Sequence, residues 1–196
     1  MAVKVSVGLR TKTARAIAIA VTGSPDHPTG VKRAELILAR PDEPAMFQPY
    51  HEGLELSWDE ARTGAKAAAA RLEQRAARAL KDFVKSLGVE ARAVHCVGIV
   101  GAPERDLARM GGRHIQAHAA EGVLFRQIWQ AAAAANGFPC VTFSDRGFAT
   151  SFVSHTRLPT ARVDACIAAL GATLGRPWRS DEKAAAMAAW VALRQR

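Results

Sequence analysis

Acidic residues follow several apolar segments of this sequence, at positions where carboxylates can hold a divalent cation. Glu104 lies four residues beyond an apolar run that ends at Val100, and Asp145 lies just after a later run. Asp181 and Glu182 open the last helical segment. Carboxylate oxygens bind Mg²⁺ and Mn²⁺, which activate water for phosphodiester hydrolysis. Glu104, Asp145 and Asp181 are therefore candidate catalytic residues of a metal-dependent enzyme, although acids at a helix start also stabilise the helix by themselves.

Basic residues form a second candidate set, because the chain carries 27 Lys and Arg against 18 Asp and Glu, a formal charge of +9. A basic protein attracts polyanions and gains affinity by releasing their counterions. An alternative explanation is that arginine-rich and alanine-rich usage reflects genome composition. The candidate nucleic-acid contacts lie at expected strand ends and helix starts: Arg10, Lys12, Arg105, Arg113 and Arg146.

Two histidines and a glutamate recur at helical spacing, namely His114, His118 and Glu121. On a helix these side chains share one face, and such a pair can ligate zinc. The spacing is not HExxH and no further ligand is evident in the sequence. We therefore interpret the group as the polar face of a helix, and we expect no metal ligand there and no cofactor, apart from Mg²⁺ or Mn²⁺ if the chain is a nuclease.

Two further motifs have both a functional and a structural explanation. Gly111 and Gly112 precede Arg113, so a helix start there can present amides and a guanidinium to an anion, or can simply form a tight turn. The 144–157 segment mixes aromatic, Arg and hydroxyl residues as single-strand stacking surfaces do. We favour a loop whose Phe148 and Phe152 pack beneath the last helices. No GxSxG motif supports a nucleophilic serine.

Length and composition favour one soluble domain spanning residues 1–196, with 49% hydrophobic and 23% charged residues. No apolar run of about 18 residues spans a bilayer. Lys4 interrupts the apolar N-terminal run, which indicates a strand and a cytoplasmic protein. Cys96, Cys140 and Cys166 are widely spaced without a CxxC pair, so we expect reduced, buried thiols.

Hydrophobic periodicity predicts the elements that must position these residues. Alternation indicates three successive antiparallel strands at 3–9, 14–21 and 33–40. Ser57 and Glu60 form a capping box that starts a long helix. Continuous apolar runs at 93–100 and 138–143 indicate buried parallel strands, with helices at 113–135, at 160–174 and from Ser180. The order is β-β-β-α-β-α-β-α-α.

This order resembles the ribonuclease H-like fold, and within it the Holliday-junction-resolvase branch. The resemblance spans nearly the whole chain as an order of elements, and two short stretches carry it: Val7-Gly-Leu-Arg10 and the last helix from Ser180 to Ala189. It implies a mixed five-stranded sheet, three strands antiparallel and then two parallel, with helices on both faces. It also implies a nuclease site in which carboxylates hold two divalent cations.

The sequence departs from that family's site at two positions. The family's essential first-strand Asp falls on Arg10, which cannot ligate a cation, and the fourth-strand acid falls near Val100 or Gly101, where no carboxylate stands. The helix acid survives as Asp181 or Glu182. Because two of three ligand positions are lost, we expect the metal-dependent chemistry of the family to be lost as well. Arg10 puts a fixed positive charge where the cation would lie, and we expect it to attract phosphate or to pair with Asp181.

Three hypotheses follow for function. The first is a catalytically degenerate ribonuclease H-like domain that binds DNA or RNA, and this hypothesis favours a protein without enzymatic activity. The second is a Mg²⁺- or Mn²⁺-dependent nuclease with displaced carboxylates. The third is a protein-interaction module that uses the 41–61 stretch, which holds six carboxylates and no Lys or Arg. Alanine-rich helix faces are compatible with a homodimer.

Overall fold

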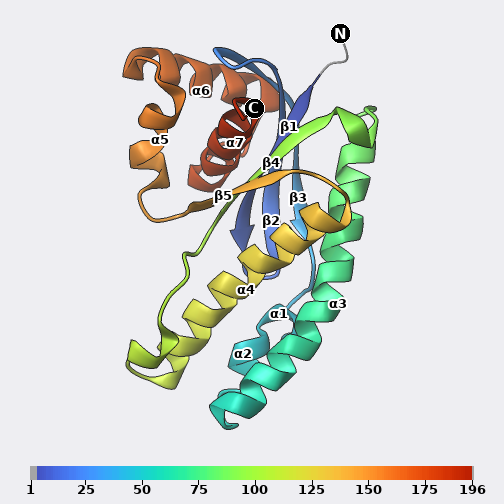
Figure 1. The fold of residues 1–196 in the computed structure, drawn as a ribbon, viewed down its shortest axis with the longest axis vertical. Helices are drawn as coiled ribbons and strands as arrows, with labels where there is room; N and C mark the ends of the chain where they lie inside the picture. The colour runs from blue at the N-terminus through green and yellow to red at the C-terminus, as the bar shows by residue number, and fades with distance from the viewer. Residues whose placement is uncertain (1–3, 196) are drawn as a thin grey trace.

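A mixed five-stranded sheet with strand order β3-β2-β1-β4-β5 forms the centre of the structure (Figure 1). The structure is a computed structural model and describes residues 4–195. Strands β1, β2 and β3 pair antiparallel, whereas β4 pairs parallel with β1, and β5 parallel with β4. The expected ribonuclease H-like sheet is confirmed. The strands are β1 (Val5–Lys12), β2 (Arg15–Ser24), β3 (His27–Ile37), β4 (Val94–Gly101) and β5 (Cys140–Ser144).

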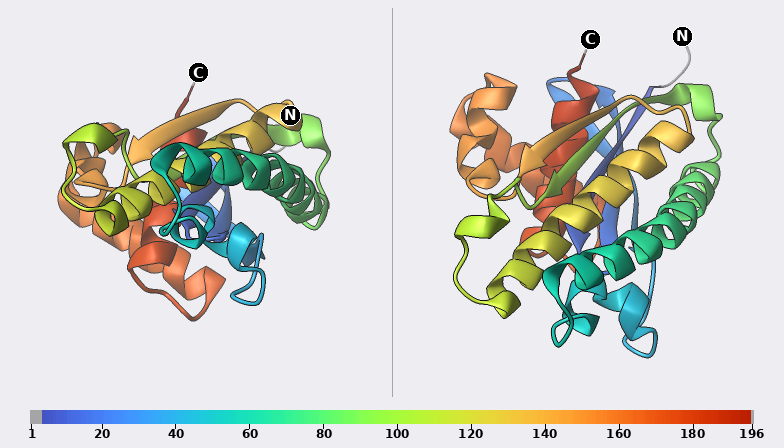
Figure 2. Two further views of the ribbon diagram at one scale, coloured as in Figure 1. Left: turned by 90° about the horizontal axis from the view of Figure 1, so that it is seen from below. Right: turned by 60° about the horizontal axis from the view of Figure 1, so that its bottom comes forward.

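Helices cover both faces of this sheet, with α3 and α4 on one side and α5 to α7 on the other (Figures 1 and 2). The α-helices are α1 (Pro44–Phe47), α2 (Pro49–Glu52), α3 (Trp58–Lys85), α4 (Arg113–Ala135), α5 (Phe148–Thr156), α6 (Thr160–Leu174) and α7 (Ser180–Leu193), and short 3-10 turns η1 (Ala91–Ala93) and η2 (Leu107–Arg109) flank β4. Each face has its own apolar core. Strand β2 feeds both cores, because alternate side chains point to opposite faces.

Local sequence signals placed the long helices well. The Ser57 hydroxyl accepts a hydrogen bond from the Glu60 amide, and the Glu60 carboxylate accepts one from the Ser57 amide, so the predicted capping box is present at the start of α3. Helix α4 has the predicted bounds, and α6 ends at Gly175, whose φ of 74° is left-handed. The sequence signals predict helix ends well where capping residues are present.

Two local predictions were wrong. The third strand was expected at 33–40, but β3 runs from His27 to Ile37, because its pairing with β2 continues to Ser24 and His27 and the hairpin turn is short. The 148–156 segment was expected to be a loop, and it forms α5. Its Phe148 and Phe152 are nevertheless buried against the last helices, as predicted, and the Phe152 ring lies 5.4 Å from that of Trp190.

Helix α7 lies unusually close to the sheet because glycine and alanine face each other. A Cβ at Gly8 would lie 1.9 Å from the Ala185 carbonyl oxygen, and one at Gly98 would lie 2.3 Å from the Ala188 carbonyl oxygen. Neither strand position can therefore carry a side chain while α7 stays in place. This close approach brings the first turn of α7, which carries Asp181, to the end of β1, where Asp181 contacts Arg10 and Lys12.

The cysteines are free, as expected, but only Cys96 and Cys166 are buried. Cys140 is exposed because it begins β5, a strand at the sheet edge, so the expectation of burial was wrong there. Within residues 4–195, no helix is long and apolar enough to cross a membrane.

Candidate functional site

The candidate site lies where β1, β4 and β5 end at the same edge of the sheet. Arg10 on β1 is in register with Val100 on β4, and Val100 is in register with Phe143 on β5. Pairing continues past β5, because the Asp145 amide donates to the Gly101 carbonyl at 2.8 Å. Three parallel strands thus deliver Arg10 and Asp145 to one place, as the carboxyl ends of strands do in open α/β sheets.

Arg10 bridges two carboxylates that are distant in sequence. Its Nη1 lies 3.2 Å from Asp145 Oδ2, and its Nε lies 3.3 Å from Asp181 Oδ1. Lys12 Nζ lies 3.2 Å from Asp181 Oδ2. The expected pairing of Arg10 with Asp181 is therefore present, and Asp145 joins it. The result is a four-residue charge cluster, hereafter the Arg10 cluster, made of Arg10, Lys12, Asp145 and Asp181.

The Arg10 cluster is partly shielded from water. The side chain of Arg10 is 18% exposed, and those of Asp145 and Asp181 are 29% and 32% exposed. Burial raises the pKa of Asp181, but the ammonium of Lys12 and the guanidinium of Arg10 outweigh burial and hold the pKa of Asp181 below its ordinary value. Asp181 is thus a carboxylate at neutral pH, held by the two cations.

A pocket of about 180 Å³ opens beside the Arg10 cluster. Hydroxyl groups and cations from the end of β1 line one side, and α4 lines the other. The lining residues include Arg10, Thr11, Lys12, Thr13, His118 and Asp145. Cations next to hydroxyl donors are the groups that bind phosphate oxygens.

The remaining candidate acids have other partners. Glu104 pairs with Arg126 on α4 and accepts a hydrogen bond from Gln127, while its side chain is 67% exposed. Glu182 is buried and accepts the Arg179 amide at 2.9 Å, so it caps the start of α7. The structure thus brings Asp145 and Asp181 together through Arg10, and it gives Glu104 a separate ion pair.

The candidate basic residues also divide into two groups. Arg113 donates to the Leu56 carbonyl at 2.6 Å and lies over the Trp58 ring, so it joins α4 to the start of α3. Arg105 and Arg146 have no ion-pair partner among residues 4–195, and Arg146 is exposed immediately after Asp145. Arg146 is therefore available to a ligand at the same edge of the sheet as the Arg10 cluster.

The structure also brings three histidines together, of which the sequence analysis identified only His114 and His118. His114 and His118 share a face of α4, and His51 from α2 joins them, so the ligand nitrogens of the three rings lie within 4.8 Å of one another. Sequence reasoning missed His51 because nothing local predicts where the short α2 packs. Burial and the neighbouring His51 and His114 lower the pKa of His118 below its ordinary value.

Comparisons with known proteins support the fold independently of the sequence. No protein-family model and no curated protein matches this sequence. Among solved structures, Thermus thermophilus RuvC aligns with 95% of this chain and 91% of its own, at a TM-score of 0.51 and 12% identity. This chain has the ribonuclease H-like fold. T. thermophilus RuvC in complex with a Holliday junction substrate aligns over 96% of this chain and 91% of its own, at a TM-score of 0.51 and 13% identity.

The ribonuclease H-like fold of nucleases implies divalent cations, and the residues present here do not fit them. The first-strand position holds Arg10, whose guanidinium already occupies the space between Asp145 and Asp181. At the end of β4, a Cβ on Gly101 would lie 2.5 Å from Thr11 Oγ1, so a carboxylate has no room there. A divalent metal ion such as Mg²⁺ needs several oxygen ligands, and here the guanidinium of Arg10 already pairs with both carboxylates.

Proposed function

We propose that this chain binds nucleic acid through the edge of the sheet around the Arg10 cluster and has lost metal-dependent cleavage. The observation that carries the proposal is the bridge from Arg10 to Asp145 and Asp181. The bridge leaves neither carboxylate free to hold a cation that would activate water, which supports the loss of cleavage. Because the two carboxylates balance Arg10 and Lys12, the net attraction for phosphate comes from Arg146 and from the basic charge of the chain.

The size of the pocket favours contact with the phosphate backbone over contact with bases. Its volume of about 180 Å³ equals roughly six water volumes, at about 30 Å³ each. That space admits a phosphate group, whereas pockets for drug-sized ligands are about 300–1,000 Å³. Phosphate contacts position a nucleic acid without reading its sequence. Binding is therefore expected to depend strongly on salt and weakly on sequence.

The charge of the whole chain supports the same function. The formal charge is +9, and Arg146 and Arg105 have no ion-pair partner among the described residues. One structural neighbour, T. thermophilus RuvC, is in complex with a Holliday junction substrate, which supports DNA as the partner. Together these features favour DNA or RNA over an uncharged partner.

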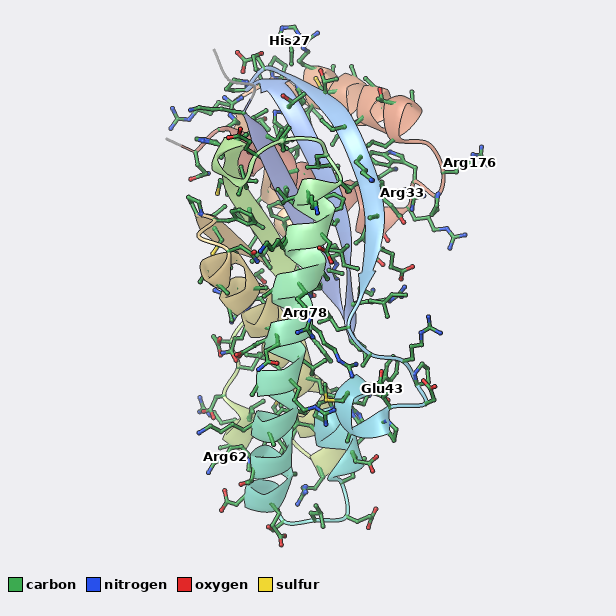
Figure 3. The ribbon with its side chains drawn as sticks, turned by 90° about the vertical axis from the view of Figure 1, so that its right-hand side faces the viewer. His27, Arg33, Glu43, Arg62, Arg78 and Arg176 are labelled. Atoms are coloured by element: carbon green, nitrogen blue, oxygen red, sulfur yellow. The ribbon has the colours of Figure 1, made fainter. Side chains whose placement is uncertain are left out.

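The test is a titration of labelled single-stranded, duplex and four-way DNA and of RNA at about 50 and about 200 mM salt. Lys12→Ala and Arg146→Ala are each expected to weaken binding to all sequences and to reduce the slope of log K against log salt by about 1. Arg78→Ala is the matched control, because it removes an exposed charge from α3, on the side of the molecule shown in Figure 3. Equal losses for all three variants would contradict a localised interface.

The same titration distinguishes the two rival functions. Strand cleavage that requires Mn²⁺ and disappears in Asp181→Asn would establish the nuclease with displaced carboxylates. Absence of binding at low salt would leave the protein-interaction module. For such a module the 41–61 stretch has fewer free carboxylates than its sequence indicates, because Glu43 already pairs with Arg75 and Glu60 caps α3.

A further inference from the structure

The three histidines contributed by α2 and α4 form a cluster with the geometry of a metal centre, hereafter the His51 cluster, made of His51, His114 and His118. His114 Nε2 and His118 Nε2 lie 3.1 Å apart. The centroid of the His51 ring lies 4.9 Å from that of His114 and 4.3 Å from that of His118. All three rings therefore direct nitrogens toward one small volume.

A buried carboxylate lies beside the His51 ring. Glu121 Oε1 accepts the backbone amides of Tyr50 and His51 at 3.1 Å each, which ties α2 to α4. The same oxygen lies 2.9 Å from His51 Nδ1. A carboxylate beside one ring nitrogen of a histidine, with the other nitrogen directed to a metal, is the usual second layer of zinc sites. This arrangement leaves His51 Nε2 for an ion.

The protein alone does not satisfy the His51 ring. His51 Nε2 is buried and has no hydrogen-bond partner, and the contact of Nδ1 with Glu121 is a close approach and not an aligned hydrogen bond. Buried polar atoms in native structures nearly always have partners, so an orphaned nitrogen calls for a ligand.

The distances agree with a first-row transition metal. With Zn–N bonds of about 2.0–2.1 Å and tetrahedral angles, ligand nitrogens lie roughly 3.3 Å apart. The His114–His118 pair is already at 3.1 Å, and the ligand nitrogens of all three rings lie within 4.8 Å of one another. Two of the three side chains are exposed and can rotate to close the remaining gap. Imidazole nitrogens suit Zn²⁺, Ni²⁺ and Cu²⁺, whereas Mg²⁺ prefers oxygen.

We propose that the His51 cluster binds one transition-metal ion of the Zn²⁺ class, with Glu121 orienting His51 and with one coordination position left open. Three histidines plus an open position is the ligand set of reactive rather than purely structural zinc. His118 and Glu121 also line the pocket beside the Arg10 cluster, so the open position lies next to the proposed phosphate-binding groups. The metal site is a separate claim from nucleic-acid binding, and either can fail alone.

The test uses the full untagged chain, treated with a chelator and titrated with Zn²⁺ and with Co²⁺. Cys140→Ser serves as the background, because this exposed thiol can bind metal by itself. One ion per chain is expected, with the visible absorption of tetrahedral Co²⁺ and a higher unfolding midpoint with metal than without. Glu121→Gln is expected to weaken binding by about 10–100-fold.

Two variants decide the result. His114→Ala removes an exposed ligand, so the chain keeps its fold, and it is expected to lose the Co²⁺ spectrum and the shift in midpoint. His27→Ala is the matched control, because His27 lies at the far end of the molecule from the α1–α2 segment and contacts Arg162 (Figure 3). Equal metal binding by His114→Ala and by the background protein, or no binding by the background protein, would overturn the proposal.

Discussion

Reversing the charge at the centre of the Arg10 cluster gives a quantitative test of what Arg10 replaces. The guanidinium lies 3.2 and 3.3 Å from two carboxylates whose side chains are about one-third exposed. Exposed ion pairs are worth about 0.2–1 kcal/mol each. Loss of a partner from a buried pair costs about 3–5 kcal/mol. For this partly buried pair of contacts we expect Arg10→Ala to cost about 2 kcal/mol, between these limits.

Arg10→Asp adds repulsion to that loss. Two unit charges at 4 Å interact by about 4 kcal/mol at an effective dielectric constant of 20, and less at the longer distances that a shorter side chain allows. We expect a total cost of about 3–4 kcal/mol in the presence of a chelator. Mn²⁺ at about 100 times its dissociation constant then restores about 2.7 kcal/mol, because three carboxylates form a hard-cation site.

The assay is urea unfolding followed by the fluorescence of the buried Trp129 and Trp190, with EDTA and with Mn²⁺. Arg10→Ala is the control, since any Mn²⁺ bound by the His51 cluster shifts both variants equally. The expected result is a Mn²⁺ shift that is larger for Arg10→Asp than for Arg10→Ala. Equal shifts, or an Arg10→Asp protein as stable as the wild type, would refute the claim that Arg10 occupies a cation position.

The pH dependence of the Arg10→Ala cost follows from the lowered pKa of Asp181. A group whose pKa is lower in the folded state stabilises the fold above its unfolded pKa, and it loses that contribution as the pH falls through the folded value. The cost of Arg10→Ala is therefore complete above about pH 4, near the ordinary Asp value, and shrinks below it. A cost that stays constant down to pH 3 would mean that Arg10 acts by packing alone.

Three further predictions concern other parts of the chain. Gly8→Ala is expected to lower the free energy of unfolding by about 3 kcal/mol or more, because the backbone of α7 blocks its Cβ. Gly64→Ala, which lies in open space on α3, is expected to raise the free energy of unfolding by up to about 1 kcal/mol. Chemical denaturation measures both changes. Asp181→Asn is expected to tighten nucleic-acid binding, since it removes a charge that neutralises Lys12, and weaker binding in a fluorescence titration would contradict this. Burial raises the pKa of Cys96 to about 11, so its thiol is expected not to react with a thiol reagent at pH 8 in the native state, and rapid labelling would show that β4 is not protected.

Most of the fold was predictable because its signals are local. The Ser57 capping box, Gly175 and the apolar run of β4 each act within a few residues, and they fixed the order of the elements. The missed helix α5 has no side-chain cap at Gly147, so only tertiary packing of its aromatic residues defines it.

The candidate site was predictable only in part, for the same physical reason. Arg10 and Asp181 were assigned to one place because the fold resemblance supplied their positions, and the structure pairs them at 3.3 Å. His51 was missed because α2 has only four residues, and a buried glutamate on α4 decides where it docks. Contacts between distant segments do not leave a periodic signal in the sequence.

One measurement tests the central claim most directly. Wild-type protein is incubated with labelled four-way DNA in EDTA and in Mn²⁺, and the bound fraction and the strand lengths are read from the same samples on native and denaturing gels. We predict salt-sensitive binding that is the same in both conditions, with every strand intact. Cleavage in Mn²⁺, or no binding at low salt, would contradict a ribonuclease H-like fold that binds nucleic acid in place of cutting it.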